Sequence, residues 1–161
     1  MPRGASPISM TFPELNTRAK PRPRTSYKWF SAITARWADI DVYGHINNVI
    51  YYSYIDTAVN RLLIEGQALD PTNGNVIGLV VASGCNYFEP LTYPAIFEIG
   101  VRVANIGNSS VRYEAGIFSE GATLSAASGH FIHVYVDRIT RRPVKLPEAF
   151  RNLLNGLTSP Q

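Results

Sequence analysis

The sequence predicts an α+β fold in which one antiparallel sheet covers one long helix. Three observations lead to this prediction. Residues 49–64 have apolar side chains at helical spacing, several other segments have the apolar character of strands, and turns rich in Gly, Pro, Asn or Asp separate them. With 161 residues, the chain has the length of one domain with a sizeable core.

The helix is the most clearly marked element. At 100° per residue from Tyr51, apolar and aromatic side chains fill one half of the cylinder and polar side chains most of the other half. The apolar half holds Tyr51, Tyr52, Tyr54, Ile55, Ala58, Val59, Leu62 and Leu63. An arc this wide indicates a helix largely wrapped by other structure. We expect Gly66 to close the helix as a left-handed cap.

Strands are expected over residues 28–37, 79–88, 97–106, 111–118 and 123–137. Gly107-Asn108-Ser109 makes a tight turn between the third and the fourth of these segments. A short helix is expected over residues 147–154, with proline at its first position. The sequence has no apolar run long enough to span a bilayer, no Walker loop, no GxGxxG fingerprint and no Gly-x-Ser-x-Gly elbow.

Basic residues are concentrated before the predicted domain. Residues 1–26 contain five prolines and are expected to form a disordered or extended basic segment, and residues 27–161 the folded domain. Residues 1–28 hold six of the 15 basic residues and one acid, so the remainder is slightly acidic. A nucleic-acid-binding face on the domain is therefore not expected. The single cysteine, Cys85, excludes an intrachain disulfide.

The chemically richest stretch runs from Asp39 to Asn48, directly before the helix. A helix that begins near Asn47 leaves its first backbone N–H groups unpaired, and these can bind a partly negative oxygen. A thioester carbonyl placed there would be polarised, and Asp41 lies close enough to attack it or to activate a water. Gly44 allows the chain to turn sharply beside a substrate.

Simpler interpretations exist for most of these residues. Asn47 or Asn48 can be an ordinary helix N-cap, and Asp39 a structural or electrostatic neighbour of Asp41. His45 can be a general acid or base, or a hydrogen-bond donor that fixes the loop. A metal site is not expected, because the three histidines form no ligand pattern. His130 and His133 fall on opposite faces of a strand by parity.

The segment from Arg36 to Tyr51 resembles the D-x-D-x-x-G-H-x-N-N-x-x-Y motif of hotdog-fold thioesterases of the 4-hydroxybenzoyl-CoA thioesterase type. The resemblance continues through the helix, the turn at residues 106–110 and the segment 136–147. It covers about residues 28–155 in the right order.

This resemblance implies a five-stranded antiparallel sheet wrapped around the helix, in a homodimer or homotetramer with active sites at the dimer interface. It implies Asp41 as the catalytic nucleophile or general base and the backbone N–H of Asn48 as the group that polarises the carbonyl. It also implies a pocket shaped by Gly44, His45, Asn47 and Tyr51.

The substrate implied by the resemblance is an acyl-CoA or acyl-carrier-protein thioester, and CoA enters only as part of it. No cofactor or metal is needed, and a cytoplasmic location is expected. Two alternatives stay open: a hotdog enoyl-CoA hydratase that uses Asp41 and His45, and a non-catalytic acyl-CoA-binding module. Arg102, Arg112 and Arg138 could meet the CoA phosphates, but exposed strand positions would explain them equally well.

Overall fold

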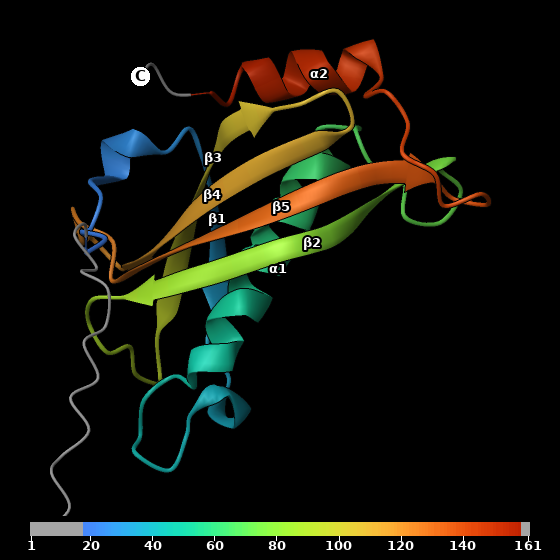
Figure 1. Cartoon of the computed structure of the whole chain (residues 1–161). Coiled ribbons are helices and arrows are strands. Elements are labelled where there is room, and N and C mark those ends of the chain that lie inside the picture. Colours follow the sequence, from blue (N-terminus) through green and yellow to red (C-terminus); the bar gives the residue numbers. More distant parts are fainter. Residues whose placement is uncertain (1–17, 159–161) are drawn as a thin grey trace, which may run out of the picture.

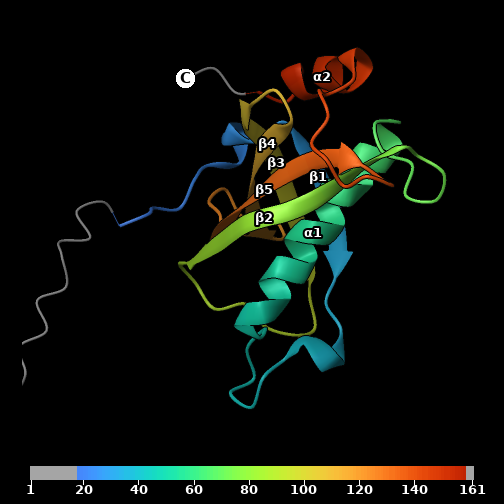
Figure 2. The same ribbon diagram turned by 45° about the vertical axis from the view of Figure 1, so that its right-hand side comes forward.

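The computed structural model describes residues 18–158 and contains one five-stranded antiparallel sheet with the long helix α1 on one face (Figure 1). The elements are β1 (Trp29–Thr34), α1 (Asn48–Glu65), β2 (Val76–Tyr87), β3 (Ile96–Ile106), β4 (Ser110–Ser119), β5 (Ala127–Asp137) and α2 (Glu148–Asn155). The strand order is β1-β3-β4-β5-β2. Figure 2 shows α1 running along the sheet, with the loop before it projecting beyond the strands. The α+β prediction is confirmed, and this arrangement is the hotdog fold.

The core lies between α1 and the sheet. Seven of the eight side chains assigned to the apolar half of the helix are buried, and Tyr52 is half-buried. They meet alternate residues of the strands, such as Ile99, Val101 and Tyr113, which are fully buried. Apolar side chains at helical spacing on α1 and at every second position of the strands thus form one continuous apolar layer.

Most element boundaries agree with the sequence prediction to within a few residues. The first strand ends earlier than predicted, at Thr34, because residues 37–39 form a short 3-10 helix. The last strand begins at Ala127 instead of residue 123. The expected turn at Gly107 is present, and its N–H donates to the carbonyl of Ser110 at 2.7 Å.

The predicted left-handed cap at Gly66 is wrong by one position. Gly66 has φ −76°, whereas the following residue, Gln67, has φ +56°. The N–H of Ala68 donates to the carbonyl of Leu63 at 2.8 Å, which is the hydrogen bond that closes a helix after a left-handed residue. The backbone of Gln67 therefore adopts the left-handed conformation for which glycine is usually selected.

Residues 18–23 form no helix, residues 24–26 form a short 3-10 helix, and this segment lies against the domain. The chain from Arg22 onward is hydrogen-bonded to the β4–β5 connection, and Tyr27 packs across Gly100 and Gly116 on the sheet face opposite α1. A Cβ atom at Gly116 would lie 2.7 Å from the Tyr27 ring, so only glycine admits this packing. The part of the predicted basic segment before residue 18 lies outside the described residues.

Helix α2 packs at the end of the sheet far from the loop before α1 (Figure 1). Phe150 is buried and contacts the ring of Tyr135 edge-on at 4.7 Å. Within residues 18–158, none of the helices has the length and apolar character required to cross a membrane.

Candidate active site

Backbone hydrogen bonds within the loop before α1 hold it in a tight turn. The N–H of Asp41 donates to the carbonyl of His45 at 2.8 Å, and the N–H of Gly44 donates to the carbonyl of Asp41 at 3.1 Å. Gly44 has φ +79°, a left-handed conformation that costs glycine little. The five residues 41–45 therefore form a tight turn that depends on glycine at its fourth position.

The turn fixes the carboxylate of Asp41 through one of its two oxygens. Oδ1 accepts hydrogen bonds from the backbone N–H groups of Tyr43 at 2.8 Å and His45 at 3.2 Å. Within residues 18–158, Oδ2 has no hydrogen-bond partner. The carboxylate is thus oriented by the backbone and still has an oxygen available for chemistry.

Asp39, the other carboxylate of the motif, has the structural role anticipated for it. It is completely buried, and its two oxygens accept four hydrogen bonds, three from Arg36 and one from the hydroxyl of Tyr54 at 2.7 Å. Burial alone would raise the pKa of Asp39, but the bonds from Arg36 outweigh it and hold this pKa below its usual value. Asp39 therefore ties the loop to α1 and has no free oxygen for a substrate.

The first turn of α1 presents an unpaired donor. Asn47 is the N-cap, and its side-chain oxygen accepts a hydrogen bond from the N–H of Val49 at 3.3 Å. Asn48 is the first helical residue, and within the described chain its N–H has no acceptor. A free N–H at a helix N-terminus favours an oxygen that carries negative charge.

An open pocket of about 360 Å³ joins these groups. Its lining residues from the loop and α1 are Asp41, His45, Ile46, Asn48 and Tyr51, and residues 87–90, from the last residue of β2 onward, complete it. Gly44 and Asn47 are not among the lining residues, so their contribution is to the backbone of the turn and the cap. Four of the six predicted site residues thus share one pocket, and the other two shape its frame.

Tyr87 is the most informative residue that sequence reasoning missed. Its hydroxyl donates to the carbonyl of Asn48 at 3.0 Å, and its ring meets Tyr51 edge-on at 4.9 Å. Tyr87 therefore fastens the end of β2 to the first turn of α1. The sequence indicates that the predicted strand ends at Glu89-Pro90. It does not indicate that the end of this strand meets the first turn of α1.

The histidines outside the motif are not near this pocket. His133 is buried on the sheet face that packs against α1, and His130 lies on the opposite face, as their parity predicted. Among residues 18–158, no group of three His, Cys, Asp or Glu side chains is placed to hold a metal ion.

A model of the thioesterase-like superfamily matches residues 35–154, which include the loop, α1, strands β2 to β5 and most of α2. The chain therefore belongs to this superfamily and is a thioester hydrolase with the hotdog fold.

The chain is similar in sequence and fold to several solved structures. It is 49% identical to the PA5185 protein of Pseudomonas aeruginosa, with a TM-score of 0.85 over 87% of this chain and 98% of that one. It is 28% identical to a Thermus thermophilus thioesterase complexed with coenzyme A and Zn, with a TM-score of 0.70 over 84% and 98%. The Bacillus subtilis protein YsmA is 24% identical over 88 residues, 55% of this chain and 59% of YsmA.

Proposed function

We propose that the protein hydrolyses an acyl-CoA thioester, with Asp41 as the catalytic carboxylate and the backbone N–H of Asn48 as the donor to the thioester carbonyl. The observation that carries the proposal is that a backbone-oriented carboxylate with a free oxygen and an unpaired helix N–H line the same pocket. Membership of the thioesterase-like superfamily and the coenzyme A bound to the Thermus relative support it.

Each group has a defined task in this reaction. The N–H of Asn48 binds the carbonyl oxygen and stabilises the negative charge that develops on it. Asp41 either takes a proton from the water that attacks the carbonyl carbon, or attacks this carbon itself to form an anhydride that water then hydrolyses. In both routes the C–S bond breaks, the sulfur leaves as the CoA thiol after protonation, and the acyl group is released as a carboxylic acid.

The replacement Asp41→Asn tests the catalytic carboxylate. It keeps a side-chain oxygen that can accept the bonds from Tyr43 and His45, so the loop should stay folded, but it removes the base or nucleophile. We expect thiol release from acyl-CoA to fall by at least about a hundredfold. The matched control is Asp56→Asn, which changes an exposed carboxylate on the polar side of α1. Equal rates for the two variants would refute the assignment.

The hydratase alternative keeps one supporting observation, because Asp41 and His45 both line the pocket. Crotonyl-CoA distinguishes the two reactions. A hydratase would remove the enoyl absorbance without producing free thiol, whereas the proposed enzyme should release thiol from saturated acyl-CoA. A protein that binds acyl-CoA and turns over neither substrate would instead be a binding module.

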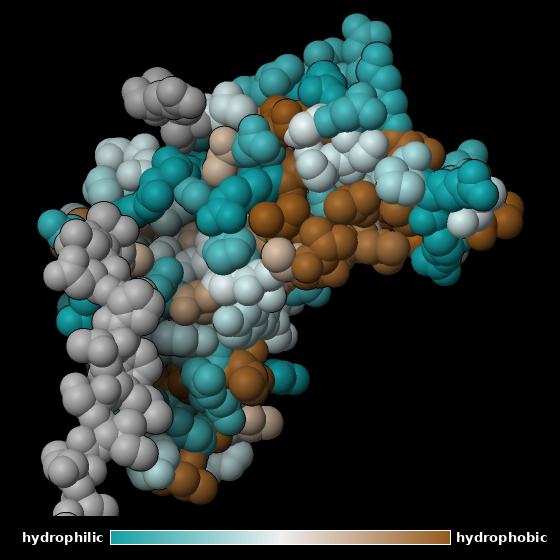
Figure 3. Space-filling view, in the orientation of Figure 1, coloured by the Kyte–Doolittle hydropathy of each residue, from teal (hydrophilic) through white to brown (hydrophobic). Residues whose placement is uncertain are grey.

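We also propose a homodimer formed along β2. In the described chain β2 pairs only with β5, so its other edge is open, and its apolar side chains Leu79, Val80 and Val81 are 39%, 50% and 60% exposed. Figure 3 shows hydrophobic side chains gathered over β5 and β2. A long open edge with apolar side chains is typical of a strand that pairs with another chain.

A charge on this edge tests the dimer. Val81→Lys should convert a dimer into a monomer on a sizing column with light-scattering detection, since an unpaired ammonium group is costly at an apolar interface. Leu124→Lys, at an exposed apolar position in the β4–β5 connection, is the control. Unchanged mass for Val81→Lys would contradict the β2 interface.

With a CoA thioester as substrate, we expect the enzyme to act in the cytoplasm.

A further inference from the structure

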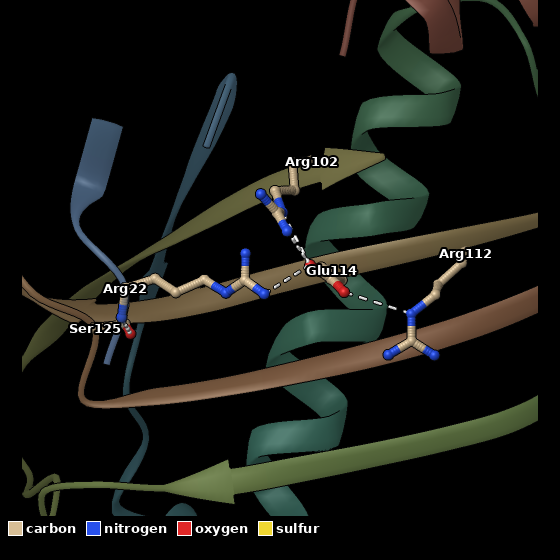
Figure 4. Close-up of polar contacts among 5 residues, drawn as sticks. All are labelled: Arg22, Arg102, Arg112, Glu114 and Ser125. Carbon is tan, nitrogen blue, oxygen red and sulfur yellow. Dashed lines mark hydrogen bonds and ion pairs between the residues drawn. The ribbon is translucent and has the colours of Figure 1, made fainter. Parts of the chain in front are cut away.

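A cluster of arginines surrounds one carboxylate on the sheet face opposite α1 (Figure 4). Arg102 of β3 donates two hydrogen bonds to Oε2 of Glu114 on β4, from Nε at 2.9 Å and from Nη2 at 2.6 Å. Arg22 of the N-terminal segment lies 3.6 Å from the same oxygen, and Arg112 of β4 reaches Oε1 through Nε at 3.4 Å. Three guanidinium groups therefore share a single negative charge.

These contacts leave positive charge uncompensated. Arg102 binds Glu114 through two of its three nitrogens, whereas both terminal nitrogens of Arg112 have no partner within residues 18–158. Lys20, which is exposed and also unpaired within that range, is close by. Four cations face one carboxylate in a domain that is otherwise slightly acidic. Such a concentration of one sign of charge attracts anions.

The cluster borders a pocket of about 170 Å³, enough for several water molecules at roughly 30 Å³ each. The carboxylate of Glu114 lies in its wall. The other polar side chains that line it can all donate hydrogen bonds: Lys20, Arg22, Tyr27, Asn86, Arg112, Ser128 and His130. It shares no lining residue with the active-site pocket. Asn86 lines this pocket and Tyr87 the other, and successive residues of a strand point to opposite faces.

The electrostatics of the neighbouring groups agree with an excess of positive charge. Burial alone would raise the pKa of Glu114, but Arg102 and the other arginines outweigh it and keep the carboxylate ionised. Burial, followed by the charge of Arg112, lowers the pKa of His130 below its usual 6.5.

Anchoring of the N-terminal segment does not account for these side chains. The main chain already holds the segment: the N–H of Arg22 donates to the hydroxyl of Ser125 at 3.0 Å, and the N–H of Ser125 donates to the carbonyl of Arg22 at 3.0 Å. Arg24 adds an ion pair with Glu98 at 2.6 Å. Neither Lys20 nor the free end of Arg112 takes part in this attachment.

We propose that this pocket is a binding site for a phosphate-bearing anion, held by Lys20, Arg22 and Arg112 with Asn86, Ser128 and His130 at its wall. Guanidinium and ammonium groups bind phosphate oxygens through charge-assisted hydrogen bonds. The phosphates of a CoA substrate and those of a separate nucleotide present the same chemistry. The site does not depend on the proposed hydrolysis, because its evidence lies wholly outside the active-site pocket.

The test is calorimetric titration of the full chain with adenosine 3′,5′-bisphosphate and with pyrophosphate at low salt. The double variant Lys20→Gln/Arg112→Gln should bind at least about tenfold more weakly than the wild type. The control variant Arg142→Gln, which removes an exposed charge from the turn after β5, should bind as the wild type does. Glu114→Gln should bind more tightly, a direction that damage to the fold would not produce.

Kinetics then identify the source of the anion. If the double variant raises KM for acyl-CoA and leaves kcat unchanged, the site takes the nucleotide end of the substrate. If KM is unchanged while bisphosphate binding is lost, it takes a separate ligand. Absence of binding to both probes in the wild type, or equal affinity of the double variant and Arg142→Gln, would overturn the proposal.

Discussion

Removing a single backbone hydrogen tests the proposed role of Asn48 more directly than any change of side chain. Proline at this position would delete the N–H and leave the rest of the peptide in place. Asn48 is the first residue of α1, where proline is well tolerated because its missing N–H has no partner inside the helix. The residue before it, Asn47, has φ −59° and ψ 135°, a conformation that a following proline permits.

The expected cost in catalysis is large and the cost in stability small. Loss of one preorganised donor to an oxyanion typically costs about 3–4 kcal/mol, or a factor of roughly 10²–10³ in kcat. The N–H of Asn48 makes no hydrogen bond within the described chain, so the folded state loses none. We therefore expect Asn48→Pro to keep its Tm within a few degrees while thiol release falls by at least a hundredfold.

The control is Asn48→Ala, which removes the same side chain and keeps the N–H. Thiol release followed with a chromogenic disulfide at saturating acyl-CoA gives kcat for both variants. Comparable kcat values for Asn48→Pro and Asn48→Ala would show that the donor is not in the reaction, and the proposed carbonyl site would have to be abandoned.

Two further predictions concern stability. His133 is buried, its Nε2 atom has no hydrogen-bond partner within residues 18–158, and burial lowers its pKa to about 4. Since the unfolded chain binds the proton near pH 6.5, the free energy of unfolding should fall by on the order of 3 kcal/mol from pH 7 to pH 4. Urea unfolding measures this change, and His133→Phe should reduce it. A slope shared by wild type and variant would contradict this origin. Tyr54→Phe removes the hydroxyl that donates to buried Asp39, and should lower the free energy of unfolding by about 1–3 kcal/mol; a variant as stable as wild type would show that Arg36 alone satisfies that carboxylate.

The part of the site that lies close together in sequence could be predicted. Asp41, Gly44, Asn47 and Asn48 act through short-range backbone geometry, so their spacing defines both the turn and the helix start. The opposite wall could not be predicted in the same way. Tyr87 reaches Asn48 across 39 residues of sequence, and this meeting depends on where β2 ends relative to α1.

The faces of the last strand show a second limit. Residues on both sides of β5 are largely apolar, so alternation alone does not tell which side meets the helix. Phe131, His133 and Tyr135 face α1, whereas Ile132 and Val134 lie on the other face. The packing of Tyr27 is similar, because it depends on Gly100 of β3 and Gly116 of β4, which lie far from it in the sequence.

The turn before α1 holds the Asp41 carboxylate through backbone groups, whereas the side chains of residues 42 and 43 take no part in holding it. Asp41 is held by the backbone N–H groups of residues 43 and 45, which every amino acid except proline provides. The side chains of Val42 and Tyr43 are 93% and 81% exposed at the same turn. A library randomised at these two positions would therefore change the exposed surface beside Asp41 and keep the backbone bonds that hold its carboxylate.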